Sequence, residues 1–127
     1  MKGYVMVGAS DLLISKNFYD QLFTTIGLKS IYQDDVCVGY AHESNEDVEF
    51  YITKPANGEP VTFGNGTQIS FYTESTEKVD NFHKAAIDLG AKNEGEPGFR
   101  PHDSNAYYAY IRDPDGNKIC SYTSVNV

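Results

Sequence analysis

The segment Tyr107–Ile119, YYAYIRDPDGNKI, predicts a β-hairpin close to the end of the chain. Its arms contain the aromatic and β-branched residues that strands favour, and we place the strands at 107–112 and 118–123. DPDG at 113–116 joins them, because proline presets φ for a turn and glycine supplies a positive φ. Alternation along the first arm puts Tyr108 and Tyr110 on one face of the strand. The opposite face carries Tyr107, Ala109 and Ile111.

The residues before this hairpin predict a strand, a helix and a further strand. The first strand covers 67–71 and the last covers 91–94. The helix between them begins at Ser75 or Thr76, since both are good N-cap residues. It ends at Gly90, which tolerates the left-handed conformation of a helix end. Its apolar face consists of Val79, Phe82, Ala86 and Leu89.

The first half of the chain predicts the same order of elements. A strand at Tyr4–Gly8 precedes a helix that begins at Ser10 or Asp11, continues to about Ile26 and is followed by Gly27. Mostly apolar residues recur on this helix at three- and four-residue steps, namely Leu12, Ser15, Tyr19, Leu22, Phe23 and Ile26. Three strands follow, at 29–33, 36–41 and 48–53.

The two halves match by position as well as by order. Phe82 follows Phe18 by 64 residues, and Gly90 follows Gly27 by 63. Prolines and glycines between the halves predict a connecting loop. The single domain 1–127 then divides into module one (1–54), a linker (55–66) and module two (67–127). The sequence predicts an α+β fold in which two βαβββ modules, each with a curved mixed sheet, form a cleft.

Composition and charge limit the partners of the chain. Acidic residues outnumber basic ones by 18 to 10, which gives a formal net charge of −8. Lysines and arginines never cluster beyond a pair, so nucleic acid is excluded as a partner. No apolar run approaches the roughly 18 residues that a membrane span needs. Cys37 and Cys120 show no CxxC spacing and the first residues show no signal-peptide pattern, so we expect a cytoplasmic protein with free thiols.

Three segments resemble the vicinal oxygen chelate superfamily of glyoxalases, bleomycin-resistance proteins and extradiol dioxygenases. They are the first-helix segment 11–28, the segment GNGTQISF at 64–71 and, most specifically, the hairpin 107–119. The resemblance implies paired βαβββ modules, frequent homodimers and, in enzymatic members, a divalent metal in the cleft. The chemistry that it implies includes a lactoylglutathione-lyase reaction, iron-dependent catechol cleavage, and the binding or modification of antibiotics.

The metal positions of that family fall on unusual residues in this sequence. The resemblance places them at Tyr4, Gln68 and Cys120, and approximately at Tyr51. Zinc, nickel and iron sites favour imidazole and carboxylate ligands, whereas a phenol with a pKa of about 10 and a thiol with a pKa of about 8.5 must first lose a proton. Glutamine offers only a neutral carbonyl oxygen. We therefore expect no cofactor, with a divalent metal as the disfavoured alternative.

The three histidines offer no clear replacement set of ligands. His42 lies in a polar stretch that predicts a turn, and His83 on the second helix is expected at the surface or its boundary. His102 lies in a predicted loop that the resemblance places near the cleft, although a solvated loop residue is the favoured interpretation.

A cleft lined by tyrosines is the remaining candidate site, and it suits a small, partly aromatic or apolar ligand. The predicted ligand-binding residues are Tyr4, Tyr51, Gln68 and Cys120, with further contacts from Arg100, His102, Tyr108 and Tyr110, and Tyr122 as a potential addition. Whether these tyrosines instead fill the core stays open. The alternative function is a lyase-like or dioxygenase-like enzyme with an atypical site around Cys120, Glu49 or His102. The sequence assigns no catalytic residue.

Overall fold

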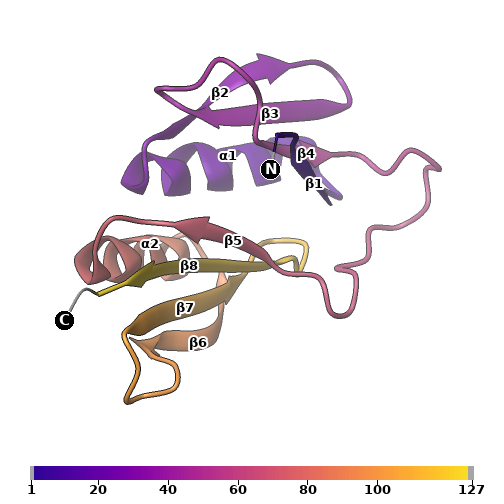
Figure 1. Cartoon of the computed structure of the whole chain (residues 1–127). Coiled ribbons are helices and arrows are strands. Elements are labelled where there is room, and N and C mark those ends of the chain that lie inside the picture. Colours follow the sequence, from indigo (N-terminus) through magenta and orange to yellow (C-terminus); the bar gives the residue numbers. More distant parts are fainter. Residues whose placement is uncertain (1, 126–127) are drawn as a thin grey trace.

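The computed structural model describes residues 2–125, and within them the chain forms two α-helices and eight strands (Figure 1). The elements of the first half are β1 (Val5–Gly8), α1 (Leu12–Leu22), the 3₁₀ turn η1 (Phe23–Thr25), β2 (Leu28–Gln33), β3 (Cys37–His42) and β4 (Phe50–Thr53). The elements of the second half are β5 (Ile69–Tyr72), α2 (Thr76–Asp88), β6 (Lys92–Phe99), β7 (Ala106–Arg112) and β8 (Lys118–Ser124). Each half therefore has the order βαβββ.

Each half builds a four-stranded mixed sheet with the same topology. The strand order is β1-β4-β3-β2 in the first sheet and β5-β8-β7-β6 in the second. In each sheet the first strand runs parallel to the last strand of its half, and the other neighbours are antiparallel. Figure 1 shows the first sheet with α1 above the second sheet with α2, joined by the long segment between β4 and β5. The predicted α+β fold of two βαβββ modules is confirmed.

Side-chain caps define where the helices begin. Asp11 caps α1, because its carboxylate accepts from the backbone N–H groups of Leu13 and Ile14. Ser75 caps α2 by accepting from the N–H of Lys78. Within residues 2–125 neither helix has the length and apolar character needed to cross a membrane.

The end of the first helix differs from the prediction. The α-helix stops at Leu22 and continues only as a 3₁₀ turn, rather than extending to about Ile26. Thr24 and Thr25 explain the difference, because their hydroxyls donate to the carbonyls of Gln21 and Leu22. Such local bonds compete with the regular helical pattern.

Strand β6 is the largest departure from the predicted elements, since it extends to Phe99 instead of ending near Glu94. The glycines and the proline in this stretch disfavour a strand when the sequence is considered alone. The pairing with β7 is irregular around Gly95 and Gly98, which is how the strand accommodates them. Gly95 faces Tyr110, and a Cβ atom there would lie 2.8 Å from the Cδ2 of that ring.

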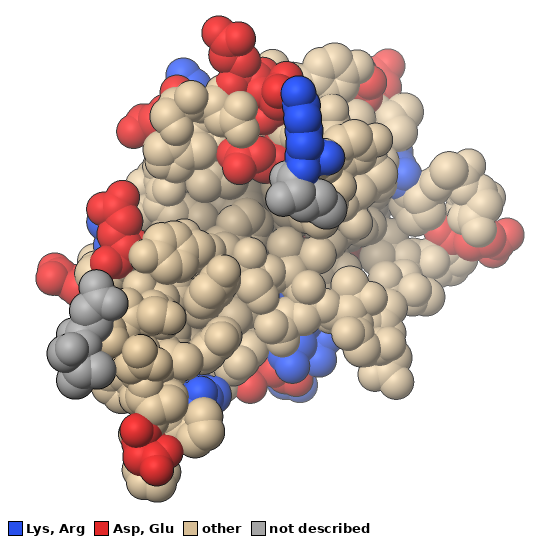
Figure 2. Space-filling view, in the orientation of Figure 1, with Lys and Arg blue, Asp and Glu red and all other residues tan. Residues whose placement is uncertain are grey.

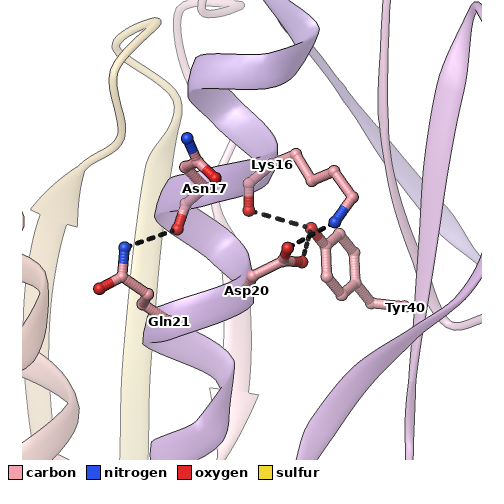
Figure 3. Close-up of polar contacts among 5 residues, drawn as sticks. All are labelled: Lys16, Asn17, Asp20, Gln21 and Tyr40. Atoms are coloured by element: carbon pink, nitrogen blue, oxygen red, sulfur yellow. Dashed lines mark hydrogen bonds and ion pairs between the residues drawn. The ribbon is translucent and has the colours of Figure 1, made fainter.

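Polar contacts fasten α1 to β3 in the first module (Figure 3). The Tyr40 hydroxyl donates to Asp20 Oδ1 at 2.8 Å, and Lys16 Nζ pairs with Asp20 Oδ2 at 2.5 Å. Burial and the Asp20 carboxylate raise the pKa of Tyr40, so this phenol stays protonated and continues to donate. On the exposed side of the helix, Gln21 Nε2 donates to the carbonyl of Asn17 at 3.2 Å.

One apolar core joins the helix-facing sides of both sheets. Phe71 on β5 connects the halves, because its ring centroid lies 5.2 Å from that of Phe23 and 5.5 Å from that of Phe50. Aromatic pairs at these distances contribute about 0.5–1.5 kcal/mol each beyond the burial of their area. The buried members of the core are Val7, Ala9, Phe18, Tyr19, Leu22, Phe23, Val38, Tyr40, Phe50, Ile52, Phe82, Ala86, Ile111 and Ile119.

A buried polar joint also ties the halves together, at the turn of the closing hairpin. The hydroxyl of Tyr19 on α1 donates to Asp113 Oδ2 at 2.7 Å. Asn117 Nδ2 donates to the same oxygen and to the carbonyl of Gly8, each at 2.9 Å. The Asp113 carboxylate therefore links the turn of module two to the first helix, and Asn117 links it to the first strand.

His83 is a correction to the expected surface or boundary position. Its side chain is 5% exposed, and its Nε2 lies 3.0 Å from Asn93 Oδ1 on β6. The reason is helical spacing, since His83 follows Val79 by one turn and shares the face of α2 that packs against the sheet. A buried histidine with a polar partner is compatible with this packing.

Candidate functional site

Three of the sequence-predicted site residues of the second module, Tyr108, Tyr110 and Cys120, lie on the face of the sheet that turns away from α2. Ile111 on β7 and Ile119 on β8 belong to the core. Side chains that alternate with them must point to the opposite face. That face carries Tyr108 and Tyr110 on β7, Cys120 and Tyr122 on β8, and Ser70 and Tyr72 on β5.

Four tyrosines form a continuous row across this face, which we call the tyrosine row: Tyr72, Tyr122, Tyr108 and Tyr110. The ring of Tyr72 meets that of Tyr122 edge-on at 5.7 Å. Tyr122 stacks on Tyr108 at 5.5 Å, and Tyr108 stacks on Tyr110 at 6.1 Å. The alternation predicted for Tyr108 and Tyr110 is confirmed, and Tyr122 joins them.

Two cations lie at the Tyr110 end of the tyrosine row. The guanidinium carbon of Arg100 lies 5.2 Å from the ring centroid of Tyr110, and Lys118 Nζ lies 5.1 Å from it. These distances are within the range of a cation–π interaction. Arg100 is held by backbone carbonyls, because its Nη1 donates to Gly98 and Tyr108 and its Nη2 donates to Glu96.

Cys120 lies beneath this surface rather than on it. The residue is fully buried, and it pairs with Ser70 on β5 and Tyr110 on β7. Burial raises the pKa of the Cys120 thiol, although the Ser70 hydroxyl and the charges of Lys118 and Arg100 oppose the rise. Gln68 reaches the same place, since its Nε2 donates to Ser70 Oγ at 3.0 Å. A thiol that stays protonated is a small apolar group, not a ready nucleophile.

The other two predicted positions meet on the first sheet. The rings of Tyr4 and Tyr51 contact edge-on with centroids 4.8 Å apart. Gly39 on β3 makes room for them, because a Cβ atom there would lie 2.8 Å from Tyr51 Cε1. Burial raises the pKa of Tyr51, so its phenol is neutral. The structure therefore pairs Tyr4 with Tyr51, and it pairs Gln68 with Ser70 above Cys120.

A cleft of about 720 Å³ lies between the edge strands β1 and β5. Tyr4 and Gln68 both line it, so one residue of each group reaches this seam. In the part of the chain that the structure describes, no hydrogen bond or ring contact joins Tyr51 to Cys120. The lining residues are Gly3, Tyr4, Val5, Ile26, Leu28, His42, Ser44, Asn45, Glu49, Gln68, Ile69, Ser70, Phe71 and Tyr72.

His42 and Glu49 enter the cleft in a way that the sequence does not predict. His42 is the last residue of β3 and not part of a turn, because β3 pairs with β2 as far as Leu28. Its backbone N–H donates to Glu49 Oε2 at 2.7 Å, and its Nδ1 lies 2.6 Å from Ser44 Oγ. His102, by contrast, is exposed in the loop between β6 and β7.

Sequence reasoning also missed Ser70, Tyr72 and Lys118. A period of two identifies them, because Ser70 and Tyr72 share the face of Gln68, and Lys118 shares that of Cys120. The strand prediction stopped one residue before Tyr72, which hid that residue's place in the row.

The donor chemistry of the family metal positions does not suit a divalent ion. Tyr4, Tyr51, Gln68 and Cys120 offer two phenols, a neutral amide and a buried thiol, whereas zinc and iron prefer imidazole and carboxylate. The raised pKa values of Tyr51 and Cys120 increase the cost of deprotonation further. Across residues 2–125, no group of three or more His, Cys, Asp or Glu side chains could hold a metal ion.

Solved structures with the same fold are numerous. A glyoxalase/bleomycin resistance protein from Albidiferax ferrireducens T118 is 41% identical, with a TM-score of 0.84 over 97% of this chain and 98% of that one. A family enzyme from Burkholderia phytofirmans PsJN is 21% identical, with a TM-score of 0.74 over 96% of this chain and 97% of that one. Lactoylglutathione lyase from Agrobacterium tumefaciens is 19% identical, with a TM-score of 0.69 over 97% and 92%. The last two likenesses show the fold alone.

Sequence comparisons agree with the structural ones. A comparison with curated proteins found no match. The model of the Glyoxalase/Bleomycin resistance protein/Dioxygenase superfamily matches residues 3–120, which is nearly the whole chain. The order of elements, the duplicated sheet topology and the relative at 41% identity lead to the same assignment. The chain belongs to the Glyoxalase/Bleomycin resistance protein/Dioxygenase superfamily.

Proposed function

We propose that this protein binds a small, partly aromatic ligand without the help of a metal ion. The observation that carries the proposal is the tyrosine row, which spans three strands on the face of the second sheet that turns away from α2. Stacked rings with phenol tips bind aromatic ligands by contact with their faces and by hydrogen bonds at their edges. The residues at the metal positions supply polar contacts in this proposal, with Gln68 and Tyr4 as the most accessible ones.

The surface around the tyrosine row is suited to such a ligand. In the view of Figure 2, uncharged side chains cover the area over β5 and β8, whereas acidic and basic groups gather toward the rim. Tyr72 on the edge strand β5 is 61% exposed, and Tyr4, just before the edge strand β1, is 57% exposed. Exposed aromatic groups of this size often mark a binding surface.

We also propose that the protein is a homodimer. Exposed apolar residues lie on the first sheet as well, including Met6 on β1 and Tyr32 on β2, each 47% exposed. A second copy would cover these side chains and close the half-sites of the two sheets into enclosed clefts.

The experiment compares metal content, turnover and ligand binding in one preparation. Protein purified without chelator is analysed for nickel, zinc, manganese and iron, and assayed with the methylglyoxal–glutathione adduct. We expect substoichiometric metal and no turnover. A screen of aromatic compounds by thermal shift on chelator-treated protein is expected to give ligands that stabilise it by the usual mass-action effect.

Variants connect the binding to the site. Gln68→Ala and Tyr108→Leu are expected to weaken the thermal shift caused by a ligand, whereas Leu13→Ala at an exposed position of α1 serves as the control. Stoichiometric metal with metal-dependent turnover would contradict this proposal. It would support the alternative function, an enzyme with an atypical site around Cys120, Glu49 or His102. Equal ligand effects in all three variants would show that binding occurs elsewhere.

A further inference from the structure

We propose that the ligand of the tyrosine row is an aromatic carboxylate, whose ring stacks on the tyrosines and whose anionic group pairs with Lys118 and Arg100. This inference rests on the proposed function and names the chemical class of its ligand. It uses two observations that ring stacking alone does not explain: two cations lie at one ring, and among residues 2–125 neither cation forms an ion pair with an acidic side chain.

Lys118 and Arg100 converge on one place from different elements. Lys118 begins β8, and Arg100 follows the end of β6, yet both lie about 5 Å from the centroid of Tyr110, at 5.1 and 5.2 Å. Both charges also lower the pKa of Cys120, which lies next to Tyr110 in the ladder. An anion that reaches both cations would interact favourably with each of them.

The nearby carboxylates are occupied by other partners. Glu94 on β6 pairs with Arg112 at 3.1 Å, and the Glu96 side chain accepts from Asn93 at 2.6 Å. The charge of Lys118 also helps to lower the pKa of Glu94, but the hydrogen bond from Arg112 is the largest cause. In the range 2–125, neither Lys118 nor Arg100 forms an ion pair with an acidic side chain. On a chain with a net charge of −8, this is a local positive site, and it acts within a Debye length of about 10 Å.

Arg100 is oriented before any ligand arrives. Three carbonyls accept from its Nη atoms, those of Gly98 at 3.2 Å, Tyr108 at 2.6 Å and Glu96 at 2.5 Å. A guanidinium has five N–H donors in a fixed plane, so donors remain for an anion. Carbonyl partners fix the group without neutralising its charge. Lys118, on a flexible stem, can then move toward the carboxylate that Arg100 orients.

Three probes separate the contribution of the ring from that of the charge. Binding of 1-naphthoate, 1-naphthamide and cyclohexanecarboxylate to the full-length protein is measured by isothermal titration calorimetry. We expect 1-naphthoate to bind at least about tenfold more tightly than either analogue, as one charge-assisted hydrogen bond or one lost stacking partner implies. Its affinity should fall with added salt, because the cations are near the surface.

Lys118→Gln is expected to reduce the affinity for 1-naphthoate about tenfold and to leave that for 1-naphthamide unchanged. Lys29→Gln removes the same charge from an exposed position on β2 and is expected to change neither. For Arg100→Gln, only the ratio of the affinities for 1-naphthoate and 1-naphthamide is interpreted. The hydrogen bonds from Arg100 to backbone carbonyls also support the loop, so their loss changes both affinities. Melting temperatures check that each variant is folded.

The outcomes distinguish this inference from the proposed function. Equal binding of 1-naphthoate and 1-naphthamide, unchanged by Lys118→Gln, would overturn the anion site and leave an aromatic site in place. Tight binding of cyclohexanecarboxylate would overturn the stacking part. If neither naphthalene compound binds, both the inference and the proposed aromatic site are contradicted.

Discussion

The buried carboxylate of Asp113 connects the two modules through hydrogen bonds. It accepts hydrogen bonds from the hydroxyl of Tyr19, the amide of Asn117 and the backbone N–H groups of Asp115 and Asn117. Burial raises the pKa of Asp113 above the usual aspartate value, although these hydrogen bonds oppose the rise. The desolvation cost of the charge is therefore only partly offset by its donors.

Tyr19→Phe is expected to destabilise the protein by about 1.5–3 kcal/mol, because it removes a hydrogen bond to a buried charged group. The free energy of unfolding is measured by urea denaturation. Tyr32→Phe is the matched control, since its hydroxyl donates to Asp34, a carboxylate that is not buried. A loss for Tyr19→Phe no larger than that of the control would contradict the role of the joint.

Asp113 and Asp34 should titrate in opposite directions. The hydroxyl of Tyr32 and the backbone N–H groups of Cys37 and Val36 lower the pKa of Asp34 to about 2, whereas burial raises that of Asp113. Asp34 therefore stabilises the fold above the unfolded-state pKa, and this contribution is lost as pH falls toward 2. For Asp113 the folded state holds its proton more tightly, so stability declines as pH rises from the unfolded pKa through the folded one. Carboxyl NMR titration measures both, and an Asp113 pKa below that of Asp34 would refute the assignment.

At the scale of the element, glycines on two strands make room for aromatic rings. Gly39 on β3 admits the ring of Tyr51, and Gly95 on β6 admits that of Tyr110. Gly39 is the ladder partner of Tyr51 on β4, and Gly95 is the ladder partner of Tyr110 on β7. The position of both rings thus depends on residues that a search for functional side chains would pass over.

Gly95→Ala is expected to destabilise the protein by about 1–3 kcal/mol through overpacking. Its new Cβ would lie 2.8 Å from Tyr110 Cδ2 and 3.3 Å from Arg100 Nη2. Gly98→Ala on the same strand is the control, because the nearest atom to its Cβ would be Arg100 Nη1 at 4.0 Å. Chemical denaturation and 1-naphthoate binding are measured for both. Equal effects of the two changes would show that Tyr110 adapts freely.

In the whole molecule, the exposed side chains of Tyr4, just before the edge strand β1, and of Met6 on β1 bear on assembly. Tyr4→Glu is expected to shift the proposed homodimer toward monomer, because the change places a charge in a contact that must be desolvated. Light scattering coupled to size-exclusion chromatography measures the mass. Leu13→Glu is the control, since Leu13 is 68% exposed on α1, away from β1. A monomeric parent protein would contradict the homodimer itself.

Local patterns in the sequence predict most of the fold. Alternation along Tyr107–Arg112, the DPDG turn and the matching positions of Gly27 and Gly90 depend on neighbours in the chain, so the order of elements and the faces of the strands follow from them. The sequence predicts too short a strand in place of β6, because glycine and proline disfavour strands. In the structure they are accommodated by irregular pairing with β7.

The site could be predicted only in part. The alternation of residues along β7 predicts that Tyr108 and Tyr110 share a face, because side chains on a strand have a period of two. The family resemblance, and not the spacing of residues, implies that phenol, amide and thiol groups stand at the metal positions. Tertiary structure alone decided that Cys120 is buried, that His42 reaches a cleft, and that Lys118 and Arg100 meet at one ring. These features depend on which strands become neighbours and how closely they pack, and the spacing of residues along one chain does not contain that information.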